Sequence, residues 1–422
     1  MNFQSTYAFA KHCDDQDSLK EYRSKFNFPQ KDSKPFIYFC GNSLGLQPKV
    51  VGEAVNDELA KWSSLGIEGY FDDANPWVDY NDDLSGIMAK VVGAKSKEVV
   101  VMNTLTVNLH FLMVSFFTPT ADRFKILIES DAFPSDRYVV ESQLKFHGYD
   151  PKDAMVIVGP REGEDCLRLE DINSRIKELG DQLALVLIGN PNYYTGQVHD
   201  MKSIAKTAHD HGAKVGFDCA HGAGNIPLDL HDANVDFAVW CTYKYLNSGP
   251  GSIAGSFIHE RHLQNHELPK FTGWWGHHRD TRFGMRDEFE PAPGALSWQV
   301  SCPPILALTG VKASLQIFEE VGIETLRSKS LKLTGYLEYL LMEINDDRIR
   351  IITPKKPSSR GCQLSIKVAN ATKKLFDNLI ANGVIVDWRE PDVIRVAPAP
   401  LYNTFDEVFR FVEILKAQLY CS

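Results

Sequence analysis

A lysine and an aspartate each follow an apolar segment that is typical of a buried strand. Lys244 comes shortly after residues 237–240 and precedes a turn rich in glycine, serine and proline, whereas Asp218 directly follows residues 215–217, 26 positions before the lysine. A charged group at the end of a buried strand is costly unless it is paired, solvated or used chemically. A lysine amine can form a Schiff base with a carbonyl compound. We therefore interpret Lys244 as the covalent anchor of a carbonyl cofactor.

The aspartate narrows the choice of cofactor. Pyridoxal phosphate (PLP) needs a carboxylate beside its pyridine nitrogen, because a protonated nitrogen makes the ring an electron sink. Asp218 meets this need, and His221 can stack on the ring or hydrogen-bond to it. Each residue taken alone also has a plainer interpretation: a lysine that emerges into solvent, a structural carboxylate and a structural histidine. The pair together predicts PLP bound at Lys244.

Two strand-to-helix junctions supply the other groups that PLP requires. Its phosphate binds to backbone N–H groups at the start of a helix, and residues 103–108 lie at such a junction. The threonines in this segment can equally be ordinary helix caps. Phe133 lies at the next junction, where its ring can stack on the cofactor or simply pack in the core. The sequence therefore predicts the phosphate at the first junction and a stacking ring at the second.

Arg395 is a lone arginine within an apolar strand near the C-terminus. A guanidinium in that setting favours a carboxylate partner that it can hold with two hydrogen bonds. The partner is either the α-carboxylate of a substrate or the side chain of a structural ion pair, and the sequence slightly favours the substrate.

Strands and helices must alternate to place these residues together. Strands are predicted at 99–102, 125–129, 155–158, 183–188, 214–217, 237–240 and 253–258, with helices at 107–117, 135–146, 169–179 and 201–211 between the first five. This alternation is typical of an α/β fold with a mainly parallel sheet covered by helices. Functional groups then collect at the carboxyl ends of the strands.

The last hundred residues have a different pattern. Helices predicted at 304–320 and 324–344 are followed by short strands and a helix at 372–382, and a final helix begins with Thr404 and Glu407 at capping-box spacing. We predict a large PLP-binding domain over residues 49–324 and a smaller α+β C-terminal domain over 325–422, with residues 1–48 packing against the small domain.

Composition excludes several classes of function. The 422 residues carry a net charge of -10, which argues against non-specific binding to nucleic acid or to anionic lipid. No apolar run approaches the roughly 20 residues that a membrane helix needs. The eight cysteines are scattered without a Cys-x-x-Cys pair, so neither a zinc site nor a dithiol motif is predicted. We expect a cytoplasmic protein without a metal.

The chain resembles kynureninases, PLP enzymes of the aspartate aminotransferase fold (fold type I), over essentially its whole length. Several motifs in order carry the resemblance: Leu-Thr-Val-Asn-Leu-His at 105–110, Phe-Pro-Ser-Asp at 133–136, Tyr-Thr-Gly-Gln at 194–197, Gly-Phe-Asp-Cys-Ala-His at 216–221, Tyr-Lys-Tyr-Leu-Asn at 243–247, Gly-Trp-Trp-Gly-His at 273–277 and Arg-Val-Ala-Pro at 395–398. The resemblance implies hydrolysis of L-kynurenine or 3-hydroxykynurenine to L-alanine and anthranilate or its 3-hydroxy form. It also implies a homodimer with the active site at the subunit interface.

The resemblance also assigns roles to particular residues. Lys244 would bind PLP and carry the substrate's α-proton, and Tyr243 would contact the phosphate and act as an acid or base, with Asp218 as the third catalytic residue. The implied cofactor contacts are Leu105, Thr106, Phe133, Pro134, Ser135, Asp136, Asp218, His221, Tyr243, Lys244, Cys302 and, from the neighbouring subunit, Trp274. The implied substrate contacts are Tyr70, His277, Ser301, Cys302 and Arg395.

Two of these positions depart from the family pattern. Cys302 stands where asparagine is usual, and Tyr70 stands where histidine is common. Both positions border the substrate's aryl ring in the family, so the preference between the two substrates stays open.

Two other functions fit parts of the sequence. One is a cysteine desulfurase of the same fold that uses Cys362 as its nucleophile, although this cysteine leads directly into an apolar strand. The other is a PLP-binding protein that has lost catalysis through its altered aryl pocket.

Overall fold

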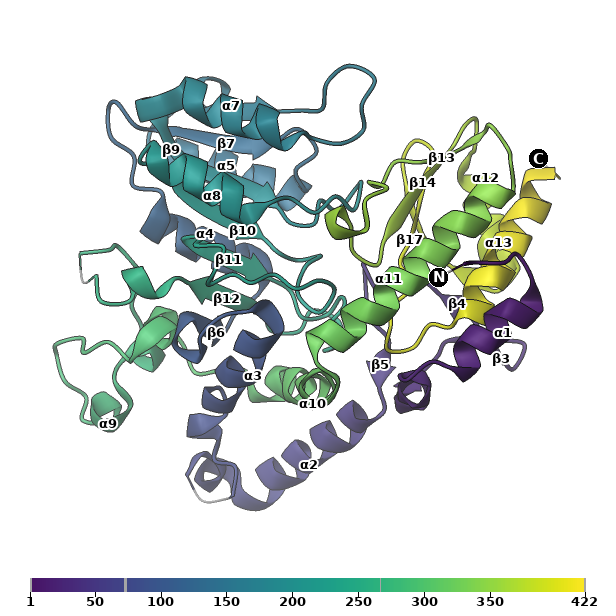
Figure 1. Cartoon of the computed structure of the whole chain (residues 1–422). Coiled ribbons are helices and arrows are strands. Elements are labelled where there is room, and N and C mark those ends of the chain that lie inside the picture. The colour runs from purple at the N-terminus through teal and green to yellow at the C-terminus, as the bar shows by residue number, and fades with distance from the viewer. Residues whose placement is uncertain (1, 72–73, 266, 421–422) are drawn as a thin grey trace.

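A seven-stranded sheet lies at the centre of the larger of the two parts of the structure (Figure 1). The computed structural model describes residues 2–71, 74–265 and 267–420. The strands are ordered β6-β12-β11-β10-β9-β7-β8. Their bounds are Val99–Val101 (β6), Lys125–Glu129 (β7), Met155–Val158 (β8), Leu183–Gly189 (β9), Lys214–Asp218 (β10), Phe237–Trp240 (β11) and Gly255–Ile258 (β12). Only β12 runs antiparallel to its neighbours, so the predicted mainly parallel sheet is confirmed.

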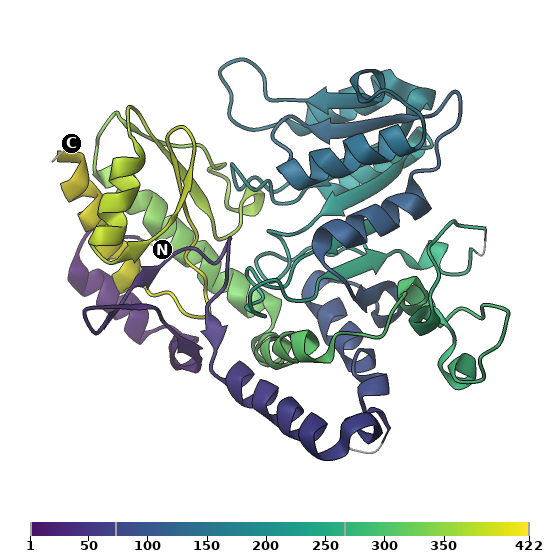
Figure 2. The ribbon, with the colours of Figure 1, turned by 180° about the vertical axis from the view of Figure 1, so that it is seen from behind.

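Helices cover both faces of this sheet. Alternate residues of β9 point to opposite sides: Val186 and Ile188 pack with α7 (Leu169–Leu179) and α8 (Met201–Asp210), whereas Leu185 and Leu187 pack with α4 (Leu105–Phe116) and α5 (Pro134–Phe146). Figures 1 and 2 show these two helix layers from opposite sides. A strand that is buried on both faces is apolar along its whole length, which is why the sequence predicted these strands closely.

Further helices complete the large sheet's surroundings. The core on the side of Val186 and Ile188 also includes residues of α3 (Asp82–Val92) and α10 (Ile305–Val321), and α2 (Val50–Leu65) packs against α10. The remaining short elements are β1 (Phe26–Asn27), β2 (Gln30–Lys31), β3 (Lys34–Pro35), β5 (Gln47–Pro48), α6 (Pro151–Ala154) and α9 (Arg279–Arg282).

The C-terminal part is built on a separate four-stranded antiparallel sheet. Its order is β13-β14-β17-β16, with bounds Ile349–Ile351, Leu364–Val368, Val393–Val396 and Asp387–Arg389. The helices around it are α11 (Ile323–Glu343), α12 (Lys373–Ala381) and α13 (Phe405–Tyr420). The predicted capping box opens α13, because the N–H of Glu407 donates to Thr404 Oγ1 at 3.1 Å and the N–H of Thr404 donates to Glu407 Oε2 at 3.2 Å.

N-terminal residues belong to the same body as the C-terminal helices. Strand β4 (Ile37–Tyr38) pairs in parallel with β15 (Val384–Ile385), and α1 (Tyr7–Asp15) packs on α13. Both views place the purple N-terminal segment beside the yellow C-terminal helix. These contacts join α1 and β4 to the C-terminal part, whereas Leu19, Phe26 and Leu46 pack in the core of the large sheet. The packing of residues 1–48 as a whole on the small domain and the domain boundaries stay predictions.

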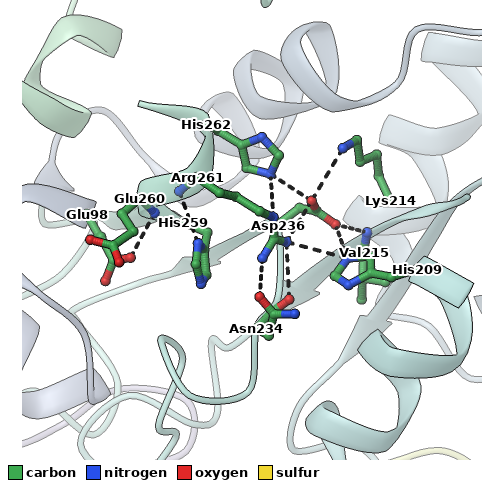
Figure 3. A network of polar contacts seen from close by, with 10 residues as sticks. All are labelled: Glu98, His209, Lys214, Val215, Asn234, Asp236, His259, Glu260, Arg261 and His262. Atoms are coloured by element: carbon green, nitrogen blue, oxygen red, sulfur yellow. Dashed lines mark hydrogen bonds and ion pairs between the residues drawn. The ribbon is translucent and has the colours of Figure 1, made fainter. Parts of the chain in front are cut away.

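A buried carboxylate joins several elements at the amino end of β11 (Figure 3). Asp236 is fully buried and accepts hydrogen bonds from Val215 N–H at 2.7 Å, from the rings of His209 and His262 at 2.8 and 2.7 Å, and from Arg261 at 2.8 Å. Burial alone raises the pKa of a carboxyl, but the two histidines and Arg261 hold the pKa of Asp236 well below its usual range. This network stabilises the sheet at the end opposite to the carboxyl ends of its strands.

Candidate active site

Lys244 lies just beyond the carboxyl end of β11, in a turn held by close backbone contacts. The N–H of Gly45 donates to the carbonyl of Tyr243 at 2.8 Å. A Cβ atom at position 45 would lie 2.3 Å from the carbonyl oxygen of Lys244, so only glycine permits this approach. The glycine-bracketed turn at 41–45 therefore meets the lysine segment. The base of the lysine is held by contacts between segments about 200 residues apart.

A cavity opens beside Lys244 at the carboxyl ends of β7, β9, β10 and β11. It brings together nine residues that the sequence predicted for the site: Leu105, Thr106, Phe133, Ser135, Asp136, Asp218, His221, Tyr243 and Lys244. It is also lined by Glu129, Gly189, Pro191, Tyr193 and Ala220. The topology explains this convergence, because neighbouring parallel strands present their ends at one edge of a sheet.

Two of the carboxyl groups in this cavity are buried and close enough to influence each other. Asp218 and Asp136 are 7% and 5% exposed. Burial raises the pKa of Asp136 well above its usual value, and the neighbouring Asp218 raises it further. Burial also raises the pKa of Asp218, which the charge of Lys244 opposes. A cation beside Asp218 would stabilise its ionised form.

Two further groups in the cavity are held neutral. Burial and the charge of Lys244 lower the pKa of His221 well below its usual value, so its imidazole is uncharged at neutral pH. Burial raises the pKa of Tyr243, so its phenol keeps its proton. The cavity therefore offers an uncharged ring and a protonated hydroxyl beside the lysine amine.

The starts of α4 and α5 form the other walls. Thr104 precedes α4 and makes no side-chain cap, so the N–H groups of Leu105 and Thr106 remain without an intrahelical partner. Such N–H groups bind anions. Phe133 precedes α5, and its ring centroid lies 5.9 Å from Lys244 Nζ and 5.2 Å from that of Tyr193. The residues of the predicted anion site and the predicted stacking ring thus line the same cavity as the lysine.

Arg395 lies next to this cavity, behind Tyr193. Its side chain is 1% exposed, Nη1 donates to the carbonyl of Tyr193 at 2.7 Å, and Nη2 donates to Asp387 and, at 3.1 Å, to Ser43. Its Nε atom is buried without a hydrogen-bond partner among the described residues. The structure therefore contains the ion pair that was one of the two interpretations of Arg395, and its role in binding a substrate carboxylate stays a prediction.

The other residues that the sequence predicted for the site do not line the cavity beside Lys244 in the single chain described by the structure. Tyr70 and Cys302 contact each other, with 3.4 Å between Oη and Sγ. Trp274 is 48% exposed and packs against Phe283, and His277 is buried and hydrogen-bonded to Thr281. Pro134 opens α5 and Ser301 is exposed; neither is a lining residue. The roles predicted for these six residues stay predictions.

Sequence reasoning overlooked Glu129 and Tyr193. Glu129 ends the apolar strand β7 as Asp218 ends β10, so the same rule would have found it. Tyr193 lies in an irregular turn, and only its contacts with Phe133 and Arg395 show that it belongs to the site.

Comparison with known proteins agrees with this geometry. Residues 326–415 match the family model "Kynureninase C-terminal domain". The chain is 54% identical to the kynureninase of Flavobacterium psychrophilum over 419 residues, which cover 99% of each chain. It is 51% identical to that of Myxococcus xanthus, covering 98% of this chain and 97% of the relative. This chain belongs to the kynureninase family. It is thus a PLP-dependent hydrolase that acts on carbon–carbon bonds.

Solved structures show that this chain has fold type I. A cysteine desulfurase from Thermococcus onnurineus superposes with a TM-score of 0.74 at 19% identity, covering 92% of this chain and 95% of that one. A variant of the cystine lyase C-DES with glycine covalently linked to its PLP cofactor gives 0.75 at 19% identity, covering 90% and 96%. At such low identity the likeness concerns the fold alone.

The residues of the cavity fit PLP. Lys244 offers the amine, Asp218 a carboxylate for the ring nitrogen, and the start of α4 the N–H donors for the phosphate. Asp136 Oδ1 is buried without a hydrogen-bond partner in the part of the chain that the structure describes. An unpaired buried acceptor is unfavourable by itself, so a polar ligand that reaches it would be stabilised.

Cys362 does not have the surroundings of a nucleophile. Its side chain is fully buried, it does not line the cavity, and burial raises the pKa of its thiol to about 11. A reactive cysteine needs an accessible thiolate. The structure therefore argues against the desulfurase alternative.

One cluster outside the cavity has the composition of a metal site. Glu98, His231 and His259 hold ligand atoms within 4.8 Å of one another, the only such group in the described ranges. Glu98 already accepts hydrogen bonds from His231 at 2.9 Å and from the N–H groups of Lys95 and Glu260. Hydrogen bonding explains the cluster without a metal. Over the same ranges, no helix is long and apolar enough to span a membrane.

Proposed function

We propose that this chain hydrolyses the Cβ–Cγ bond of L-kynurenine or 3-hydroxykynurenine, forming L-alanine and anthranilate or 3-hydroxyanthranilate. The observation that carries the proposal is the placement of Lys244 and Asp218 in one cavity, with Arg395 hydrogen-bonded to the lining residue Tyr193, in a member of this family. One water is consumed: its hydroxyl joins the ketone carbon, which becomes the aryl carboxylate, and a proton joins Cβ, which becomes the methyl group of alanine.

PLP, when bound, withdraws electrons from the bonds at the substrate's α-carbon. The amine of Lys244 holds the cofactor and afterwards moves a proton at that carbon. Asp218 would lie beside the ring nitrogen, whose positive charge would favour the carboxylate form against the effect of burial, while the neutral imidazole of His221 would contact the ring without adding charge. The N–H groups of Leu105 and Thr106 bind the phosphate.

Tyr243 and Arg395 act on the substrate. The phenol of Tyr243 keeps its proton at neutral pH and can donate it to the leaving carbon or to the ketone oxygen. The free Nε of Arg395 donates to the substrate's α-carboxylate and fixes which bond faces the cofactor.

We further propose a homodimer in which the partner subunit completes the site. Support comes from an exposed aromatic surface near the contact between Tyr70 and Cys302: Phe71, Trp274 and Phe283 are 55%, 48% and 49% exposed and pack on one another. Exposed apolar patches of this kind are typical of subunit interfaces. A cytoplasmic location, inferred from the scattered cysteines, is part of the same proposal.

The proposal is tested by steady-state assays with kynurenine and 3-hydroxykynurenine, followed by the fluorescence of the aryl amine product. We expect turnover of at least one substrate, and the ratio of the two kcat/KM values measures the effect of Tyr70 and Cys302. Inactivity on both substrates, together with normal visible absorbance of bound PLP, would instead support the non-catalytic alternative.

A further inference from the structure

Glu129 is a buried carboxylate at the cavity that the proposed reaction does not use directly. It ends β7, is 3% exposed and lines the cavity. Its Oε1 accepts a hydrogen bond from the N–H of Gly189 at 3.0 Å, and its Oε2 accepts one from the side-chain amide of Asn192 at 2.9 Å. A Cβ atom at position 189 would lie 2.9 Å from Oε1, so this backbone approaches the carboxylate very closely. Both carboxylate oxygens thus accept hydrogen bonds from one stretch of chain, residues 189–195, which we call the 189–195 segment.

Asn192 carries this constraint into the next turn. Its Oδ1 accepts hydrogen bonds from the N–H and the hydroxyl of Thr195, at 2.9 and 3.1 Å. The turn directs the carbonyl of Tyr193 at Arg395 Nη1, 2.7 Å away, and sets the ring of Tyr193 edge-on against Phe133. The hydrogen bond between Asn192 and Glu129 and that between Tyr193 and the guanidinium of Arg395 are therefore joined by the backbone of two adjacent residues.

We propose that Glu129 is a positioning residue that acts through Asn192, holding the 189–195 segment so that Tyr193 orients Arg395. The inference rests on the proposed function, in which Arg395 binds the substrate's α-carboxylate. A buried carboxylate that accepts two hydrogen bonds is stable only while both donors remain in place. The position of the segment is therefore set by the two carboxylate oxygens, and an amide at position 129 cannot accept from both donors at once.

The test uses Glu129→Gln in the PLP-loaded enzyme. The new NH2 group faces either the N–H of Gly189 or the amide of Asn192, so one donor loses its acceptor. We expect the KM for L-kynurenine to rise by about tenfold or more, with kcat within about threefold of wild type. In the PLP-free protein, we expect faster amide hydrogen exchange in residues 189–197. A purely structural role would lower stability without separating KM from kcat.

The matched control combines Glu129→Gln with Asn192→Asp. The donor and the acceptor then exchange places: the glutamine amide donates to the new carboxylate at position 192, whose other oxygen still accepts from the turn. We expect this double variant to recover wild-type KM and slow exchange. An unchanged KM in the single variant, or a loss that the double variant does not recover, overturns the proposal.

Two further outcomes are informative. If Glu129→Gln does not fold, Asn192→Asp alone must raise KM, because it keeps the turn's acceptor and removes only the donor to Glu129; an unchanged KM there overturns the proposal. A wild-type chain that is inactive on kynurenine refutes the proposed function, and hydrogen exchange in the single and double variants then still decides whether Glu129 holds the segment.

Discussion

Replacing Arg395 with lysine keeps the positive charge and removes the planar guanidinium. In the structure Nη1 and Nη2 donate to Tyr193, Asp387 and Ser43, and Nε has no hydrogen-bond partner among the described residues, so the proposed substrate contact is made by Nε. A lysine ammonium on a flexible stem would pair with Asp387, the carboxylate that Arg395 already contacts, and would have no second donor in a fixed position. The ion pair within the protein would then form at the expense of substrate binding.

The size of this effect follows from the one contact that is lost. A hydrogen bond between charged groups contributes about 1.5–3 kcal/mol, and each 1.4 kcal/mol is a factor of about ten. We therefore expect KM for L-kynurenine to rise roughly 10- to 150-fold in Arg395→Lys. The value of kcat should remain within about threefold, because Nε contacts none of the bonds that change.

Steady-state kinetics on the PLP-loaded enzyme measure both constants, and binding of L-alanine, followed by the cofactor's visible absorbance, reports the carboxylate contact without turnover. Arg350→Lys is the matched control: it lies in the same small sheet and forms a half-exposed ion pair with Asp165 at 2.7 Å, so its KM should not change. The reasoning fails if Arg395→Lys keeps wild-type KM and wild-type alanine binding, or if kcat falls while KM does not change.

Four further predictions concern the anchor, the ring partner, the excluded nucleophile and the distant acid. Lys244→Ala should abolish the visible absorbance of covalently held PLP, and borohydride labelling of another lysine would contradict the assignment. Asp218→Ala should still bind PLP measurably but lose about 100-fold or more in kcat, and near-wild-type turnover would place the ring's partner elsewhere. Cys362→Ala should leave kynurenine cleavage intact, whereas a desulfurase nucleophile would make this variant inactive in sulfur release. Asp236→Asn should lower the free energy of unfolding at pH 7 by roughly 3 kcal/mol. Because the pKa of Asp236 is depressed in the folded state, its contribution to stability is complete above the unfolded pKa of about 3.9 and is lost progressively as the pH falls below that value. Denaturant unfolding should therefore show a smaller difference between Asp236→Asn and wild type at pH 3 than at pH 7.

The sequence predicted the sheet well because all of its strands except the edge strand β8 are largely buried. Strands such as β9 and β11 are apolar along their whole length, and the helices between them show their own caps and turns. The same pattern identified Asp218, because a charged residue stands there at the end of an apolar run. Glu129 also ends an apolar run, so the sequence contained the information needed to predict it.

Other parts of the site could not be predicted from local patterns. The reversed direction of β12 depends on pairing with β6, which lies more than 150 residues earlier in the chain. Tyr193 has no signal of its own, because its role comes from a carbonyl that meets an arginine 202 positions away. Likewise, Tyr70 and Cys302 were predicted at one pocket, and the structure places them in contact with each other outside the cavity of a single chain.

The sequence by itself determined the chemistry of this protein: an amine and a carboxylate at the ends of buried strands, with helix starts between them, are local features that burial and hydrogen bonding impose on residue types. The tertiary structure alone decided which of these groups meet. Glu129, Asn192, Tyr193 and Arg395 form one chain of contacts only because the large sheet and the small sheet pack together. Contacts between distant segments depend on that packing, and no local pattern records it.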